Sequence, residues 1–268
     1  MKKILAVILC LAAALTLTAC GSFEYSFDKS TLTKYTGKGG DVVIPKGITV
    51  IGKEAFYQCD TLTGVVIPNG VTTIYANAFA ECPNLKTVTI PDSVTTLSFS
   101  VFYSCTALER IDLPSGMTEI SGGVFANCTS LSEITIPQSV TKFSATAFVN
   151  TPWLENKRKE DPLVIVNNVL VDGQTCSGSV LIPNGVTAID ELAFSDCNNI
   201  EVTVPDSVSR IAFGAFCRCY NLNIILPDSL TQVDPDAFEF CDNISVTYKG
   251  ITYSENQLDK FFRATKSS

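Results

Sequence analysis

Cysteine is the residue with the most chemistry to offer in this chain, and seven of the eleven cysteines recur at a regular interval. Cysteines in an oxidising compartment can pair as disulfides, and clustered cysteines can bind zinc. The interval is 23 residues early in the chain and 22 residues late, with one wider gap. The series consists of Cys59, Cys82, Cys105, Cys128, Cys197, Cys219 and Cys241.

The regular spacing favours buried thiols over bridges or a metal site. Each cysteine fills one slot of a repeated unit, and Thr151 fills the same slot in one copy. A slot that accepts threonine needs a small side chain that hydrogen-bonds locally, and a free cysteine behaves as a small buried hydrophobe. Oxidation of adjacent cysteines stays open, whereas zinc is disfavoured because the chain has neither histidine nor a Cys-x-x-Cys pair. Cys176 lies outside the series, and we expect it to be the most exposed thiol.

Cys20 points to a different chemistry. Lys2 and Lys3 precede an apolar run over residues 4–17, which is the charge order and length of a secretory signal. The next residues, Leu-Thr-Ala-Cys at 17–20, resemble a bacterial lipobox, which implies a signal peptide at 1–19 and diacylation of Cys20. The apolar run is short for a membrane-spanning helix. We therefore expect a chain lipid-anchored at the extracellular face of the bacterial envelope, with soluble secretion as the alternative.

Charge and composition disfavour nucleic-acid binding and catalysis. Without Lys2 and Lys3 the mature chain has 17 basic residues against 27 acidic ones, so it cannot neutralise phosphates as nucleic-acid-binding proteins do. The absence of histidine removes the commonest general base and metal ligand. Asp92, Asp206 and Asp228 follow prolines and obey the repeat as turn residues. We expect no enzymatic activity and no cofactor.

The cysteines are carried by eight copies of a short phrase: Ile-Pro or a variant, then valine and threonine, then Ala-Phe, Cys and Leu. A unit this short cannot bury an apolar face alone, so successive copies must stack as the coils of a solenoid. The phrase is marked by prolines at 45, 68, 91, 114, 137, 183, 205 and 227.

Residues 88–110 show how one coil is built. Residues 88–90 alternate inward, outward and inward, which is the period of a strand. Pro91 ends the strand because proline cannot donate a ladder hydrogen bond. Val94 and Leu97 form a second apolar pair, and the following segment around Phe102 is too short for more than one or two helical turns.

One phenylalanine occupies the same position in every coil. Stacked coils lie roughly 4.8 Å apart, so we expect these rings to form one continuous buried spine. A sugar-binding row of exposed rings is the alternative, which the small apolar neighbours of each ring disfavour. The column consists of Phe56, Phe79, Phe102, Phe125, Phe148, Phe194, Phe216 and Phe238.

The array breaks between Pro137 and Pro183, which lie 46 residues apart with no Ile-Pro at the midpoint. Residues 163–171 predict a hairpin with a two-residue turn at Asn167 and Asn168. Residues 163–179 resemble the start of the array, so we interpret them as an internal restart equivalent to the N-terminal cap; a patch for one lost coil is the alternative. The candidate contact residues of this insert are Trp153, Lys157, Arg158 and Lys159.

The C-terminus has the features of a cap. Residues 246–253 alternate like a hairpin, and residues 254–257 form a capping-box pattern that opens a short helix. The expected organisation is a signal peptide at 1–19, a lipidated N-terminus and cap at 20–40, repeat block one at 41–151, the insert and restart at 152–179, repeat block two at 180–247, and a C-terminal cap at 248–268.

The repeat has a family resemblance. The pattern Leu-x-x-Val-x-Ile-Pro-x-x-Val-x-x-Ile-x-x-x-Ala-Phe-x-x-Cys runs from Leu62 to Cys82, recurs from Leu85, and resembles the BspA-like class of leucine-rich repeats. The resemblance covers roughly residues 41–250. It implies a β-rich leucine-rich-repeat solenoid, a horseshoe-like right-handed superhelix of 22–23-residue coils, with short parallel strands on one face and short helical turns on the other. Members are largely bacterial surface proteins, several associated with adhesion.

The outward residues of the strands vary from coil to coil while the inward residues stay apolar, which is typical of a recognition face but also of a solvated surface. We expect a monomeric, cell-surface-tethered lipoprotein that binds an extracellular protein or glycoprotein in adhesion and touches the membrane only through its lipid. The alternative is a non-catalytic envelope scaffold or assembly subunit. The candidate binding face consists of Lys86, Thr87, Thr89, Glu109, Arg110, Asp112, Ser132, Glu133 and Thr135.

Overall fold

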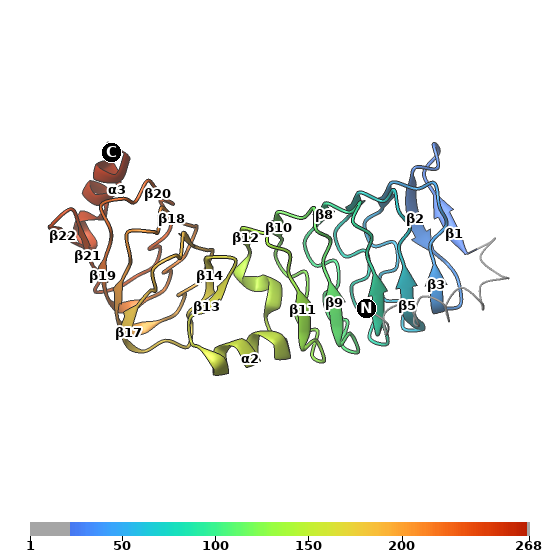
Figure 1. Ribbon diagram of the computed structural model, residues 1–268, viewed down its shortest axis with the longest axis horizontal. Helices are drawn as coiled ribbons and strands as arrows, with labels where there is room; N and C mark the ends of the chain where they lie inside the picture. Colours follow the sequence, from blue (N-terminus) through green and yellow to red (C-terminus); the bar gives the residue numbers. More distant parts are fainter. Residues whose placement is uncertain (1–21, 267–268) are drawn as a thin grey trace.

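The computed structural model describes residues 22–266. The coils stack along the long axis of one elongated body, with the N-terminal strands at one end and the C-terminal helix at the other (Figure 1). Cys20 and the signal peptide predicted for residues 1–19 lie outside the described residues. Within residues 22–266, every helix is too short or too polar to cross a bilayer.

Each coil contributes one short strand to a ladder of parallel strands, which we call the narrow ladder. Its hydrogen-bonded runs are β2-β4-β6-β8, β10-β12 and β14-β16-β18-β20. The strands are β2 (Thr31–Tyr35), β4 (Val50–Ile51), β6 (Thr73–Ile74), β8 (Thr96–Leu97), β10 (Glu119–Ile120), β12 (Lys142–Phe143), β14 (Val169–Asp172), β16 (Ala188–Ile189), β18 (Arg210–Ile211) and β20 (Gln232–Val233).

The strands predicted from the Ile-Pro phrase form a second parallel ladder, which we call the broad ladder. Its runs are β3-β5-β7, β9-β11 and β15-β17-β19-β21. The predicted solenoid of short parallel strands is therefore confirmed. The strands are β3 (Gly40–Val43), β5 (Leu62–Val66), β7 (Thr87–Thr89), β9 (Arg110–Asp112), β11 (Glu133–Thr135), β15 (Gly178–Leu181), β17 (Asn198–Thr203), β19 (Tyr220–Ile225) and β21 (Ser245–Tyr248).

The segment between the ladders, expected to form helical turns, is a run of hydrogen-bonded turns in most coils and becomes helical only in η1 (Ala145–Phe148) within the described chain. Left-handed residues interrupt it: Glu54 and Gln58 have φ of 59° and 56°. A residue with positive φ cannot continue a right-handed helix. The turn backbones bond instead to the next coil, as where the Phe56 N–H donates to the Ala78 carbonyl at 2.7 Å.

The phenylalanine column forms a buried spine, but not the single continuous one that we expected. From Phe56 to Phe148 neighbouring ring centroids lie 4.8–6.2 Å apart and the rings are stacked. Trp153 then packs on Phe148 with centroids 4.5 Å apart and ends the first stack. A second stack runs from Phe194 to Phe238. The prediction of one continuous spine is wrong because the insert replaces the coil that would have carried the connecting ring.

The break in the array consists of a helix and a hairpin. The helix α2 (Pro152–Glu160) begins at Thr151, whose side chain accepts a hydrogen bond from the Leu154 N–H, and it lies in the row of broad-ladder strands beyond β11 (Figure 1). The strand β13 (Val164–Val166) pairs antiparallel with β14. Asn167 and Asn168 form the predicted turn with φ of 50° and 64°, so the hairpin is confirmed.

The hairpin repeats the topology of the chain's first strands. The strand β1 (Phe23–Tyr25) pairs antiparallel with β2, and β2 then starts a parallel run of the narrow ladder, as β14 does. The apolar core divides at this point into two clusters that meet on β14: Val169 and Val171 belong to the first and Leu170 to the second. Each cluster corresponds to one block of coils.

The C-terminal cap has the predicted form. The strand β22 (Ile251–Ser254) closes a hairpin with β21, and the short helices η2 (Glu255–Gln257) and α3 (Leu258–Lys266) follow. The Ser254 N–H donates to the Gln257 side chain at 3.3 Å, as in a capping box. Phe261 is fully buried, with its ring 6.0 Å from that of Phe238. The cap therefore covers the last ring of the second stack.

Candidate interaction surfaces

The nine residues of the predicted binding face all lie exposed on one side of the broad ladder. Six belong to β7, β9 and β11, and the others directly precede these strands. Arg110 is opposite Glu133, and Asp112 is opposite Thr135, in the parallel register of β9 and β11. We call these nine residues the strand face: Lys86, Thr87, Thr89, Glu109, Arg110, Asp112, Ser132, Glu133 and Thr135.

The charges of the strand face are partly paired with each other. Arg110 contacts Glu133 at 2.9 Å and Asp112 at 3.0 Å, and the Thr135 hydroxyl donates to Asp112. The hydrogen bonds from Thr135 and Arg110 lower the pKa of Asp112. Exposed ion pairs contribute only about 0–1 kcal/mol each, so a partner can replace these contacts at little cost. The strand face is therefore an ordered polar surface that remains open to new hydrogen bonds.

The insert residues separate into buried and exposed members. Trp153 is only 7% exposed because its ring packs on Phe148, which corrects the expectation that it contacts a partner. The Arg158 guanidinium donates to both carboxylate oxygens of the buried Asp172, at 2.9 and 2.6 Å. Lys157 pairs with Glu160 at 2.9 Å on the exposed side of α2, and Lys159 is also exposed. Only the two lysines remain accessible as contact residues.

The recurring cysteines are free thiols, as are all nine cysteines within residues 22–266. The Sγ of Cys82 lies 3.1 Å from the Phe56 carbonyl oxygen of the preceding coil, and Cys105 and Cys128 repeat this contact one coil further on each time. Thr151, in the same slot, donates to the carbonyl of Phe148 at 2.7 Å. The slot therefore takes a small side chain with a hydrogen-bond donor, but the short cysteine contacts cross to the preceding coil, whereas Thr151 makes the local bond that was predicted.

The burial of these thiols suppresses their reactivity. Burial raises the pKa of Cys82 and of Cys128 to about 12, so almost no thiolate exists at neutral pH. Cys176 is half-buried, and so are Cys59 and Cys241 of the series, whereas the other six described cysteines are buried. Within the described residues, no cluster of three or more acidic or cysteine side chains is arranged to hold a metal ion.

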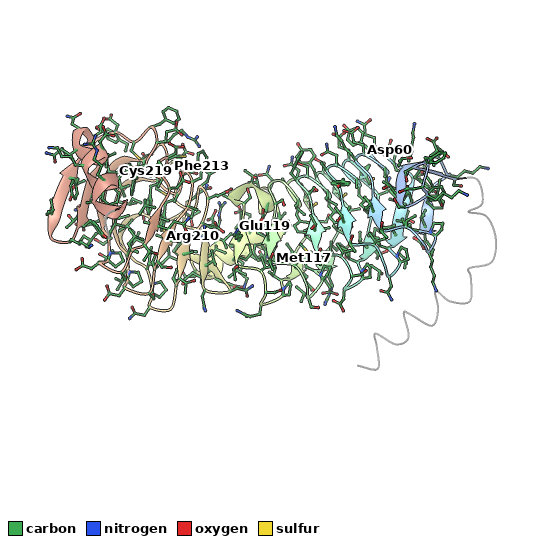
Figure 2. All side chains as sticks on the ribbon, turned by 90° about the horizontal axis from the view of Figure 1, so that it is seen from above. Asp60, Met117, Glu119, Arg210, Phe213 and Cys219 are labelled. Atoms are coloured by element: carbon green, nitrogen blue, oxygen red, sulfur yellow. The ribbon has the colours of Figure 1, made fainter. Side chains whose placement is uncertain are left out.

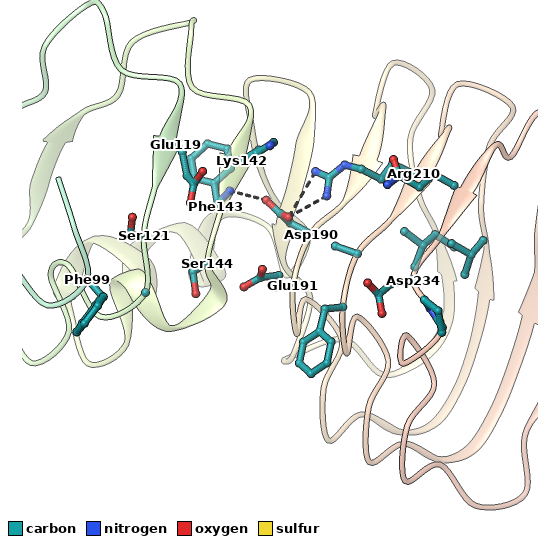
Figure 3. Close-up of a pocket in the computed structure, with 17 residues that line it drawn as sticks. Phe99, Glu119, Ser121, Lys142, Phe143, Ser144, Asp190, Glu191, Arg210 and Asp234 are labelled. Carbon is teal, nitrogen blue, oxygen red and sulfur yellow. Dashed lines mark hydrogen bonds and ion pairs between the residues drawn. The ribbon is translucent and has the colours of Figure 1, made fainter. Parts of the chain in front are cut away.

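A cleft that the sequence did not reveal lies where the two blocks meet. Its volume is about 620 Å³. Phe99, Glu119 and Ser144 come from the first block, and Glu191, Phe213 and Asp234 from the second. Figure 3 shows Glu191 and Ser144 pointing toward each other across the space, and Figure 2 places Glu119 and Arg210 near the middle of the long body. We call this space the junction cleft.

Asp190 connects the two blocks at the junction cleft through contacts with Phe143 of the first block and Arg210 of the second. Its side chain accepts the Phe143 N–H at 2.6 Å and lies 3.4 Å from the Arg210 guanidinium (Figure 3). Phe143 ends the second run of the narrow ladder, so the carboxylate takes the place of the next strand's carbonyl as acceptor. Burial raises the pKa of Asp190, although Phe143 and Arg210 oppose the shift.

Glu191 is half-buried and faces the junction cleft. Burial raises its pKa first, and the negative charges of Asp190 and Glu119 raise it further, against a hydrogen bond from Ser144 and the charge of Arg210. A raised carboxyl pKa means that its surroundings disfavour the charged form, here through burial and neighbouring negative charges that Arg210 only partly offsets. The site therefore favours a positively charged group close to Glu191.

Comparison with known proteins fits this architecture. A family profile described as the BspA type leucine-rich repeat region matches residues 24–155 and 173–261. The chain belongs to this family. The unmatched residues 156–172 hold most of α2 and the β13–β14 hairpin, which is where the repeat is interrupted.

Solved structures of leucine-rich repeat proteins resemble the chain along much of its length. A leucine-rich repeat protein of T. pallidum is 25% identical, with 77% of this chain and 87% of that chain covered and a TM-score of 0.50. A leucine rich cell surface protein from Faecalibacterium prausnitzii A2-165 is 22% identical, with 92% and 98% covered and a TM-score of 0.43. A search of curated proteins returned no significant match.

The junction cleft of this BspA-type protein contains two neighbouring carboxyl groups, those of Asp190 and Glu191, with raised pKa. Two neighbouring carboxyl groups with raised pKa can form an acid–base pair. Asp190 is only 2% exposed, however, and its oxygens are occupied by Phe143 and Arg210, so it cannot approach a substrate. Of these two carboxyl groups, only that of Glu191 faces the cleft. The sequence feature that could have indicated the junction cleft is Asp190, because the equivalent position in other coils is occupied by Ser98, Ser121 and Ser144.

Proposed function

We propose that the protein is a cell-surface lipoprotein, tethered to a membrane through Cys20, that binds an extracellular protein or glycoprotein in adhesion. The observation that carries this proposal is the strand face, where exposed polar side chains differ from coil to coil above a core that stays constant. Membership of the BspA-type repeat family supports it, because repeat scaffolds offer extended surfaces for binding. Ligand affinity would come from many weak contacts along the stacked strands.

The anchor can be tested separately from binding. A Cys20→Ser variant should leave the membrane fraction and lose the mass of the acyl chains, because two acyl chains are needed for stable anchoring. A Cys176→Ser variant is the matched control and should stay in the membrane fraction. Membrane retention of the Cys20→Ser variant would contradict the anchor.

The binding test uses whole cells that display the protein. We expect saturable attachment to immobilised mucosal glycoproteins or matrix proteins, and attachment at least about tenfold weaker in a Thr89→Trp and Ser132→Trp double variant, because bulky rings obstruct the centre of an interface. A Thr118→Trp variant places the same ring on an exposed residue beside the narrow ladder and should bind normally. Absence of saturable attachment in the unaltered protein would refute adhesion.

An envelope scaffold is the second candidate function, favoured by the exposed aliphatic residues Leu181 and Ile225, which lie in one register row of β15, β17 and β19. This function predicts that the protein co-purifies with envelope proteins after cross-linking. It also predicts that deletion of the protein leaves attachment to host material unchanged.

A further inference from the structure

We propose that the junction cleft is a second binding site, and that it takes a lysine- or arginine-bearing segment of a protein partner. The first observation is a pair of exposed aromatic rings. Phe99 is 60% exposed and Phe213 is 47% exposed, and each is the second residue after a narrow-ladder strand. In register, the equivalent residues between them along the array are Gly122, Ala145, Asp172 and Glu191, none of which is aromatic.

The rings thus bracket the site from both blocks. Phe99 extends from the coil of β8 and Phe213 from the coil of β18, and both line the cleft. A single exposed phenylalanine is ordinary on a protein surface. Two at the same coil position, facing a space between blocks, provide the apolar walls that ligand sites commonly have, and about 620 Å³ lies within the usual range for such sites.

The acidic lining of the cleft favours a positively charged occupant. Arg210 is engaged by Asp190, and Lys142 lies opposite Glu119 in the register of β10 and β12. The cleft is lined by four carboxyl groups, those of Glu119, Asp190, Glu191 and Asp234, against two cations, Lys142 and Arg210. The charge of Arg210 also acts on Glu191, but within residues 22–266 neither Glu191 nor Asp234 forms an ion pair, so negative charge remains in excess. An incoming ammonium or guanidinium group would supply the missing positive charge.

The two observations converge on one chemistry. A lysine or arginine side chain is attracted both to carboxylates and to the faces of aromatic rings. A neutral sugar could stack on the rings but would leave the carboxylate of Glu191 without an ion pair. The excess of acidic over basic residues in the chain also favours the approach of a basic partner.

This inference deepens the proposed function, because it names the chemistry of the partner, and it rests on that function. The junction cleft and the strand face nevertheless use different residues on different ladders. A variant in one surface leaves the other intact, so either idea can fail alone.

The test uses the full mature chain in a polyoxyethylene detergent and measures fluorescence anisotropy of labelled peptides. We expect saturable binding of a (Gly-Ser-Arg)4 peptide that weakens with added salt. The same peptide with citrulline in place of arginine should bind at least about fivefold more weakly, since it keeps the shape but loses the charge.

Two cleft variants and two matched controls locate the peptide. Glu191→Gln and Phe213→Ala should each weaken binding roughly three- to tenfold. Glu24→Gln removes an exposed carboxylate at the N-terminal end, and Phe240→Ala removes a ring that is 75% exposed outside the cleft, so both should bind normally. Unfolding curves of each variant check that the fold is kept.

Three results would overturn the proposal. Equal binding of the citrulline peptide would show that the cleft does not recognise the positive charge of arginine. Competition by chitotetraose at similar concentration would make the cleft a glycan site. Loss of peptide binding in the Thr89→Trp and Ser132→Trp variant, with normal binding in Glu191→Gln, would move the basic segment to the strand face and leave the proposed function standing.

Discussion

Replacement of Arg158 by methionine should destabilise the middle of the solenoid strongly, even though the residue lies in a run of charged residues that resembles a solvated surface. The guanidinium makes two hydrogen bonds to Asp172, one at 3.1 Å to Gln174 and one at 2.9 Å to the exposed Glu155. The side chain of Arg158 is 19% exposed and that of Asp172 only 7%. The pair connects α2 to β14, the two elements that interrupt the repeat.

The magnitude follows from the burial of Asp172. Methionine keeps the length of the side chain but leaves a buried carboxylate without its cation, which typically costs about 3–5 kcal/mol. Removal of both charges in an Arg158→Met and Asp172→Leu double variant should recover most of this loss, to within about 1 kcal/mol, because no buried charge remains. Lys157→Met removes an exposed cation from the same helix and should cost less than about 0.5 kcal/mol.

The assay is urea unfolding followed by tryptophan fluorescence. Trp153 is the chain's single tryptophan, it lies on α2, and it packs on Phe148 at 4.5 Å, so its emission reports on the region that the substitution disturbs. A loss in Arg158→Met no larger than that in Lys157→Met would refute the reasoning. So would a double variant as unstable as the sum of its two single variants.

Replacing Phe102 by alanine should lower the free energy of unfolding by about 3–5 kcal/mol because its ring is fully buried, whereas Phe99→Ala, at a 60% exposed ring, should change it by less than about 0.5 kcal/mol; circular dichroism during chemical unfolding measures both. Iodoacetamide should label Cys82 and Cys128 roughly a thousandfold more slowly in the folded chain at pH 8 than in the unfolded chain, because burial raises their pKa from 9.0 to about 12; mass spectrometry of timed samples gives the site-specific rates. Burial and neighbouring carboxylates raise the pKa of Glu191 above its ordinary 4.5, so the folded chain binds this proton more tightly than the unfolded chain. The stability contributed by Glu191 should therefore fall as the pH rises from 4.5 through the folded-state value, and Glu191→Gln should flatten the pH dependence of the unfolding midpoint; a profile identical to that of the unaltered protein would contradict this sign.

The parts of the fold that the sequence predicts are those determined by local chemistry repeated in register. Phe79 and its equivalents stack because each occupies the same place in its coil, so one periodic column predicts the contacts between its own rings within a block. Asn167 and Asn168 predict a tight turn because asparagine tolerates positive φ. Ser254 predicts the start of the last helix through its cap. None of these features depends on how distant coils meet.

The features that escaped prediction depend on tertiary contacts or on very short segments. The narrow ladder consists mostly of two-residue strands such as Thr96–Leu97, which are too short to show a period of two. The helix α2 did carry a signal, because Thr151 precedes Pro152 and these residues suit the N-cap and the first helical position. Its charged residues instead suggested an insert that contacts a partner. Burial of Arg158 could not be inferred from sequence, because its partner Asp172 lies on another element.

The location of the junction cleft follows from the regularity of everything around it. A solenoid of identical coils presents the same surface at each step and therefore offers ridges more readily than enclosed spaces. Here α2 displaces one broad-ladder strand and the β13–β14 hairpin starts the stack again, so the core divides in two and the coils of the two blocks face each other across a gap. Asp190 closes the inner end of that gap by holding Phe143. Asp190, for example, occupies a position where three coils of the first block have serine. In a scaffold of this kind, departures from the repeat are the first places to test for a specific ligand.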